Sequence, residues 1–270
     1  MLRRKRTFFL MILSVLTVHV WSNSSAELFK AVSACDLEKT KALLSSGIDV
    51  DARDSSGITP LMVASRAPWG CSLDMVKLLV GNGADVNAKV PETGTTALML
   101  AIGDLAKVKY LVSNGANINE MDNVTAVNGF NAVIHAAIYA SVSGDLKCLE
   151  FLLDNGGNVN VTMADGKSLL MLMVEMTAGG EKGGIPAVKY LLEKGADINH
   201  KAVSGETSLL IAVDYGNYSL TKLLLRHGAD PNCMNKSLQT PLSIAKAKNY
   251  IKLGRLLVRH GAKSGAISSL

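Results

Sequence analysis

The chain has 270 residues and a formal net charge of +5. Four bases and no acid lie in its first 26 residues, so the remainder is close to neutral. A nearly neutral chain of mixed charge has no electrostatic footprint for nucleic acid or an anionic membrane, and we predict no nucleic-acid partner.

The first 26 residues have the three-part layout of a secretory signal peptide. A basic cluster at 3–6 precedes an apolar run at 8–21, and small residues follow at 24–26. The apolar run is shorter than the roughly 20 residues that a membrane-spanning helix needs. We predict a cleavable segment at 1–26 and a periplasmic or secreted mature chain at 27–270 with no stable membrane insertion. The alternative is that the segment is retained as an N-terminal membrane anchor.

A sequence motif of the type L-L-x-x-G-A-D-x-N recurs through the remaining chain. Its glycines are spaced 36, 32, 41, 39, 33 and 33 residues apart, and a leucine stands four residues before each. The glycines are Gly47, Gly83, Gly115, Gly156, Gly195, Gly228 and Gly261. The motif predicts a helix with one apolar face, a glycine at its end, and a turn formed by Asp or Asn that leads into a finger.

A second motif precedes each of these helices after the first, and its fullest form is GITPLMVA at 57–64. Threonine can cap a helix start, and proline is tolerated at the first helical position. Each repeat is therefore predicted to hold a short helix, a tight loop, a second helix and a finger. No repeat can bury its apolar face alone, so neighbouring repeats must stack.

This pattern resembles the ankyrin repeat over about residues 27–263, on the evidence of G-x-T-P-L, the helix-ending glycine, the paired leucines and G-A-D-x-N. The resemblance implies an all-α ankyrin repeat solenoid of about seven helix-turn-helix units with β-hairpin-like fingers. We expect units at about 27–53, 54–89, 90–121, 122–162, 163–201, 202–234 and 235–263, and a short C-terminal tail at 264–270.

The chain departs from the family at one position of the first helix. The family often has histidine after the leucine, whereas this chain has Met62, Met99, Ile134, Met171, Leu210 and Ser243. We expect the hydrogen bonds that such a histidine makes to be absent.

Cys35 and Cys71 occupy equivalent positions in adjacent repeats. Equivalent helices pack about 8–10 Å apart, whereas a disulfide needs Cα atoms within about 7 Å. The longer loop of the second repeat could bring the pair together, and export would permit oxidation. A disulfide and two thiols are both open at this stage. Cys148 is predicted to be a buried apolar residue, and Cys233 begins the last finger.

The sequence contains no G-x-x-x-x-G-K-[ST] phosphate loop, no serine elbow and no paired-histidine helix motif. We predict that the protein is not an enzyme and has no catalytic residues, no metal site and no cofactor. The aspartates of G-A-D-x-N are interpreted as turn formers.

The family resemblance implies recognition of a protein partner through the finger tips and the concave face. The corresponding finger residues of this chain are Arg53, Asp54, Lys89, Glu92, Glu120, Met121, Asp122 and Lys201. In the lengthened loop of the second repeat, Trp69 with Arg66 nearby has the composition of a binding hot spot. The alternative is that Trp69 folds back and covers the edge of the stack.

These observations predict a non-enzymatic protein–protein interaction module in an exported compartment, typical of a bacterial periplasmic protein that binds and regulates or protects a partner. An immunity protein that neutralises a periplasmic toxin enzyme is a specific form. A secreted effector that binds a host protein is the alternative. A glycan binder is disfavoured because aromatic residues make up 5% of the chain, too few to line a sugar pocket.

Overall fold

The computed structural model describes residues 24–66, 70–123, 129–180 and 184–263. In these ranges the regular structure is helical, and β-type pairing is limited to the isolated bridges Lys89–Thr96 and Thr162–Ser168. The prediction of an all-α fold is therefore confirmed. The chain divides into an N-terminal part, residues 1–117, and a C-terminal part, residues 118–270.

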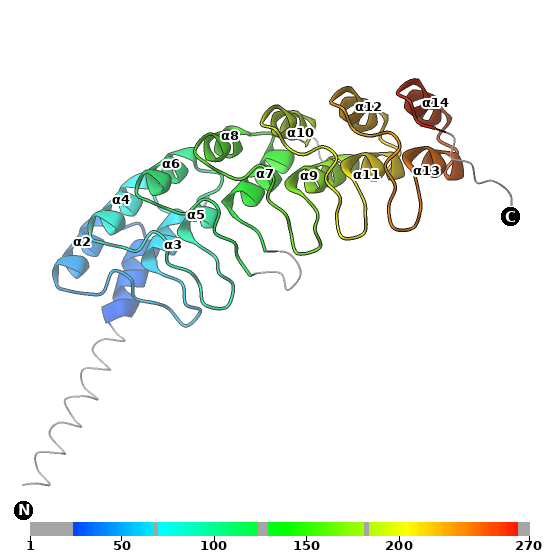
Figure 1. Cartoon of the computed structure of the whole chain (residues 1–270). Coiled ribbons are helices and arrows are strands. Elements are labelled where there is room, and N and C mark those ends of the chain that lie inside the picture. The colour runs from blue at the N-terminus through cyan, green and yellow to red at the C-terminus, as the bar shows by residue number, and fades with distance from the viewer. Residues whose placement is uncertain (1–23, 67–69, 124–128, 181–183, 264–270) are drawn as a thin grey trace, which may run out of the picture. The chain divides into compact units, whose positions relative to one another are not determined.

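The N-terminal part begins with a helix at residues 24–33. Its further helices are α2 (Leu37–Ser45), α3 (Pro60–Ser65), α4 (Leu73–Gly81), α5 (Ala97–Leu100) and α6 (Leu105–Ser113). Helix α4 packs between α2 and α6, and α3 packs on α5 (Figure 1). The second helices of the repeats thus form one layer and the first helices another.

The C-terminal part repeats this arrangement. Its helices are α7 (Ala132–Ser143), α8 (Lys147–Asp154), α9 (Leu169–Ala178), α10 (Gly184–Glu193), α11 (Ser208–Asp214), α12 (Tyr218–Arg226), α13 (Pro241–Ala247) and α14 (Ile251–Arg259). In Figure 1, the second helices α8, α10, α12 and α14 lie in one row. The first helices lie in another row, from which the finger loops extend away from the second helices.

The first helices begin at the predicted caps. A side-chain oxygen of the residue before each helix accepts the main-chain N–H three residues further on, and the capping residues are Thr59, Thr96, Asn131, Ser168, Thr207 and Thr240. At α13, the Ser243 hydroxyl accepts the N–H of Thr240 at 2.8 Å. Our expectation that no side chain at the histidine position makes such a bond is therefore wrong for α13, where a serine hydroxyl reaches the same donor. It is also wrong for α3, where the Met62 sulfur accepts the N–H of Thr59 at 3.5 Å.

The apolar core follows the leucine that stands four residues before each recurring glycine. This leucine is fully buried in each second helix from α4 to α14, at Leu79, Leu111, Leu152, Leu191, Leu224 and Leu257. The equivalent Leu43 of α2 is half-buried. Among the described second helices, α2 packs against one neighbour, α4, so its leucine is less covered.

Asparagine side chains join the finger of one repeat to the next repeat. Asn119 donates from its amide nitrogen to the carbonyl of Gly156 at 2.9 Å, and its amide oxygen accepts the N–H of Asn158 at 2.9 Å. The same pair of bonds is made by Asn87, Asn160, Asn199 and Asn232. At the first junction Asp51 stands in this place, and its carboxylate accepts the N–H of Asp85. A carboxylate has no proton with which to reach the glycine carbonyl.

The aspartates of the recurring motif are turn formers, as predicted. The carboxylates of Asp85, Asp197 and Asp230 each accept the main-chain N–H two residues further on. The aspartate of the motif therefore stabilises its own turn, and the asparagine forms hydrogen bonds with the neighbouring repeat.

We expect Leu152→Ala to lower the free energy of unfolding by about 2–5 kcal/mol, because it leaves a cavity in a fully buried position. Urea denaturation followed by circular dichroism measures the change. Lys189→Ala on α10 is the control, since Lys189 is exposed and its truncation should change stability little. Equal destabilisation by both variants would contradict the assignment of the core.

Candidate protein-binding surface

An open groove lies in the N-terminal part between the helix at 24–33, the finger at 53–58 and α3. Its larger section has a volume of about 710 Å³ and is lined by Ser25, Ala26, Phe29, Ser33, Arg53, Asp54, Ser55 and Val63. Ser33 and Val63 also line a smaller section of about 230 Å³, together with Arg66 and Cys71. The groove thus brings together three of the predicted partner-binding residues, Arg53, Asp54 and Arg66.

Two of these three side chains are held by hydrogen bonds within the protein. The Arg53 guanidinium donates to the carbonyls of Gly57 and Lys89, each at 2.8 Å. The Asp54 carboxylate accepts the N–H groups of Ser56 at 2.8 Å and Ile58 at 2.9 Å. Arg53 and Asp54 therefore shape the finger that forms one wall of the groove.

Arg66 follows the last turn of α3 and is exposed. No hydrogen bond or ion pair between described residues uses its guanidinium, which leaves this cation available at the smaller section of the groove. Trp69, the other predicted hot-spot residue, lies outside the described residues.

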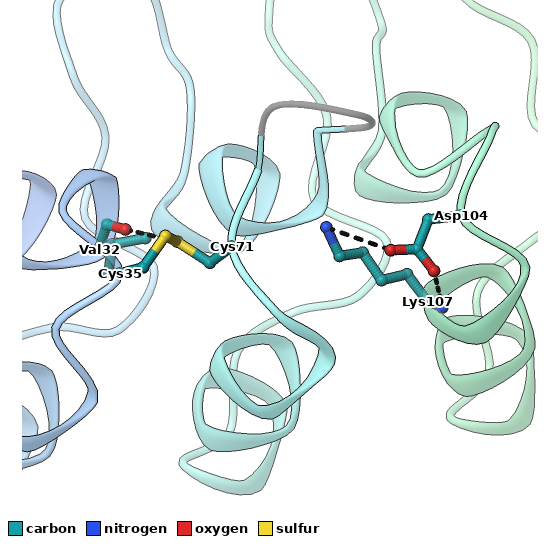
Figure 2. Close-up of a disulfide and its surroundings, with 5 residues drawn as sticks. All are labelled: Val32, Cys35, Cys71, Asp104 and Lys107. Carbon is teal, nitrogen blue, oxygen red and sulfur yellow. Dashed lines mark hydrogen bonds and ion pairs between the residues drawn. A yellow bond between two sulfur atoms is a disulfide. The ribbon is translucent and has the colours of Figure 1, made fainter.

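A disulfide joins Cys35 to Cys71 at the smaller section of the groove (Figure 2). Their Cα atoms are 5.3 Å apart. The spacing of packed helices does not apply to this pair, because both residues lie in the turns between helices. Cys35 adopts a left-handed conformation with φ of 55°, and the carbonyl oxygen of Val32 lies 2.8 Å from the Cys71 sulfur.

Figure 2 also shows the side chain of Lys107 beside Asp104, a pair that was not predicted from the sequence. The Lys107 side chain is 3% exposed, and its Nζ lies 3.6 Å from the Asp104 carboxylate. Asp104 also caps α6 by accepting the N–H groups of Ala106 and Lys107. This arrangement compensates a buried charge and is a structural feature of α6. The spacing of three residues between acid and base was the available signal.

The other predicted finger residues differ in exposure. Lys89 and Glu92 are exposed on a finger of the N-terminal part, and Lys201 is exposed on a finger of the C-terminal part. Glu120 and Met121 are half-buried. Exposed predicted residues therefore lie on fingers of both parts.

The assignment of Asp122 to an exposed finger position is wrong, because its side chain is 1% exposed. Its carboxylate accepts the N–H of Phe130 at 2.8 Å and lies 3.2 Å from His135 Nε2. Its own N–H donates to the Phe130 carbonyl at 2.7 Å. Asp122 thus joins the main chain at Phe130, whereas its position in the sequence suggested a finger tip.

The family model for three copies of the ankyrin repeat matches residues 28–122, 119–202 and 170–267. The chain belongs to the ankyrin repeat family. Among solved structures, it resembles the crystal structure of the ankyrin repeat domain of Bcl-3, described as a unique member of the IkappaB protein family. The TM-score is 0.70 at 25% identity, over 85% of this chain and 97% of that chain. No curated protein matches the chain.

Ankyrin repeat domains serve as protein–protein interaction modules, and this fold is typically a non-enzymatic scaffold. Within the described ranges, no group of three or more His, Cys, Asp or Glu side chains is arranged to hold a metal ion. None of the helices in those ranges has the length and apolar character needed to cross a bilayer.

We expect Asp122→Ala to lower the free energy of unfolding by about 1–3 kcal/mol, since it leaves the part-buried N–H of Phe130 without its acceptor. Lys201→Ala is the control, because Lys201 is exposed on another finger of the same part. Guanidinium denaturation of both variants measures the difference. If Asp122→Ala were no more destabilising than Lys201→Ala, the structural role of this carboxylate would be rejected.

Proposed function

We propose that this ankyrin repeat protein works in an exported compartment, as a non-enzymatic module that binds a partner protein and regulates or protects it. The observation that carries the proposal is the Cys35–Cys71 disulfide. Disulfides persist in oxidising compartments and are rare in the cytosol. The signal-like layout of residues 1–26 supports the same compartment.

The groove of the N-terminal part supports a link between processing and binding. Cleavage after Ala26 would remove Ser25 and Ala26 from the lining of its larger section. The apolar ring of Phe29 and the wall formed by Arg53 and Asp54 would remain. The mature chain would therefore have a more open groove than its precursor.

Glu27 would become the first residue of the mature chain, and it already holds the first helix to α2. Its carboxylate accepts hydrogen bonds from Lys39 at 2.9 Å and Lys30 at 3.0 Å. These two ammonium groups lower the pKa of Glu27, Lys39 having the larger effect. The shortened helix would thus keep its contact with α2 after processing.

An immunity protein that neutralises a toxin enzyme in the periplasm is a specific form of this proposal. A secreted effector that binds a host protein is the second candidate, and the export signal and the disulfide support it equally. The two differ in where the partner is found, either in the producing cell or in a host.

Expression of the full chain in a bacterium tests the compartment. Mass spectrometry of the periplasmic fraction is expected to find a chain that begins at Glu27 and contains a Cys35–Cys71 peptide. Burial raises the pKa of the Cys233 thiol, so this cysteine should resist alkylation until the protein is unfolded. An uncleaved chain in the cytoplasm with reduced Cys35 and Cys71 would contradict the proposal.

Affinity capture with the mature chain as bait tests the binding surface. Fractions from the producing cell and from host cells are compared, using wild-type bait, Arg66→Glu at the groove and Lys77→Glu on α4 as an exposed charge-matched control. A partner captured by wild type and by the control, but not by Arg66→Glu, is the expected result. A partner captured equally by all three baits would place binding elsewhere.

A further inference from the structure

The near-neutral total charge hides a segregation along the C-terminal part. Residues 118–201 contain ten acids and six bases, whereas the last two repeats, residues 202–263, contain nine bases and three acids. The charges of the last two repeats are therefore mostly basic, and our expectation of evenly mixed charge is wrong for these repeats. Charge asymmetry of this size points to an interaction with a partner of opposite sign.

The change of sign is visible at equivalent positions of the second helices. Two residues after the buried leucine stand Asp154 on α8, Glu193 on α10, Arg226 on α12 and Arg259 on α14. All four are exposed. Helices α12 and α14 pack against each other, so their bases lie on one continuous face.

We name this face the basic surface, and it consists of Lys222, Arg226, Lys252, Arg255 and Arg259. None of the ion pairs between described residues involves any of the five. In contrast, Asp154 on the acidic stretch pairs with Lys194. The basic surface is therefore uncompensated within the described part of the chain.

Helix stability alone does not account for these bases. Arg226 and Arg259 lie in the last turns of their helices, where a cation interacts favourably with the helix dipole. Lys252 lies at the start of α14, where a cation is unfavourable, and Lys222 and Arg255 lie near the middle. Three of the five charges thus gain nothing from the helix ends.

Apolar side chains lie beside the bases on α14. Ile251 is 59% exposed and Val258 is 56% exposed. The residue of α12 equivalent to Val258 is Leu225, which is buried at 7% exposure. The surface on α14 therefore combines cations with an uncovered apolar strip, a composition found in the centres of protein interfaces.

We propose that the basic surface of α12 and α14 docks an acidic segment of a partner protein. Three of its five bases are arginine, whose planar guanidinium binds a carboxylate through two parallel hydrogen bonds. Each of the two helices carries a pair of bases one helical turn apart, Lys222 and Arg226 on α12 and Arg255 and Arg259 on α14. The two pairs form two neighbouring rows. Carboxylates at the same spacing on a partner helix match these rows. This surface is separate from the groove of the N-terminal part and does not depend on export.

The probe is a fluorescent synthetic peptide of alternating Glu and Ala pairs, with a Gln-for-Glu peptide of equal length as its neutral counterpart. Fluorescence anisotropy measures binding to the mature chain at two salt concentrations. The variant Arg226→Glu with Arg259→Glu is compared with Lys147→Glu and Lys189→Glu, which makes the same charge change on α8 and α10. Circular dichroism verifies that both variants are folded.

We expect the acidic peptide to bind wild type and the control variant, and to bind the Arg226→Glu, Arg259→Glu variant at least about tenfold more weakly. Binding should weaken as salt rises, and the neutral peptide should not bind. Equal weakening in both variants would overturn the proposal, as would no binding of the acidic peptide. Tighter binding to phosphatidylglycerol vesicles or duplex DNA than to the peptide would overturn the choice of an acidic protein segment.

Discussion

The asparagine of the recurring motif carries the contact on which the stacked fold depends. Each such side chain uses both halves of its amide, donating to a glycine carbonyl of the next repeat and accepting a main-chain N–H two residues beyond it, as Asn199 does with Gly228 and Asp230. Leucines such as Leu224 supply the apolar burial, which is not directional. The two hydrogen bonds of the side-chain amide are directional, so they fix the register in which the apolar faces meet.

At the first junction only half of this contact is made, and other interactions are concentrated there. Asp51 accepts the N–H of Asp85 but cannot donate to the glycine carbonyl. At the same junction, Arg53 donates to the Lys89 carbonyl and the Cys35–Cys71 disulfide joins the two repeats covalently. A disulfide that closes a loop of this length stabilises mainly by restricting the unfolded chain, typically by about 2–4 kcal/mol. The groove that we propose as a binding site therefore lies at a junction held by a disulfide and by hydrogen bonds from charged side chains to the main chain.

Local chemistry explains which features the sequence predicted. The threonine caps are local to one helix start, and the leucines recur at a fixed offset from the glycine, so Thr59 and Leu152 were assigned correctly. Asp122 depends on a contact with Phe130, eight residues away, which residue spacing alone does not give. The spacing of Asp104 and Lys107 signals their ion pair, but the burial of Lys107 depends on the packing around α6. The hydrogen bonds of asparagine to the next repeat could not be predicted, because the sequence does not give the distance between repeats. The charge segregation required only counting by repeat, and the total charge concealed it.

The most direct test of this account is the free energy of unfolding of Asn199→Ala compared with that of Asn155→Ala. Both residues are exposed asparagines, but the Asn155 amide donates within its own helix, to the Phe151 carbonyl, and not to the next repeat. The account predicts that Asn199→Ala loses about 1–3 kcal/mol and that Asn155→Ala loses clearly less. Equal losses in the two variants would contradict the claim that the asparagine bridges hold the repeats in register.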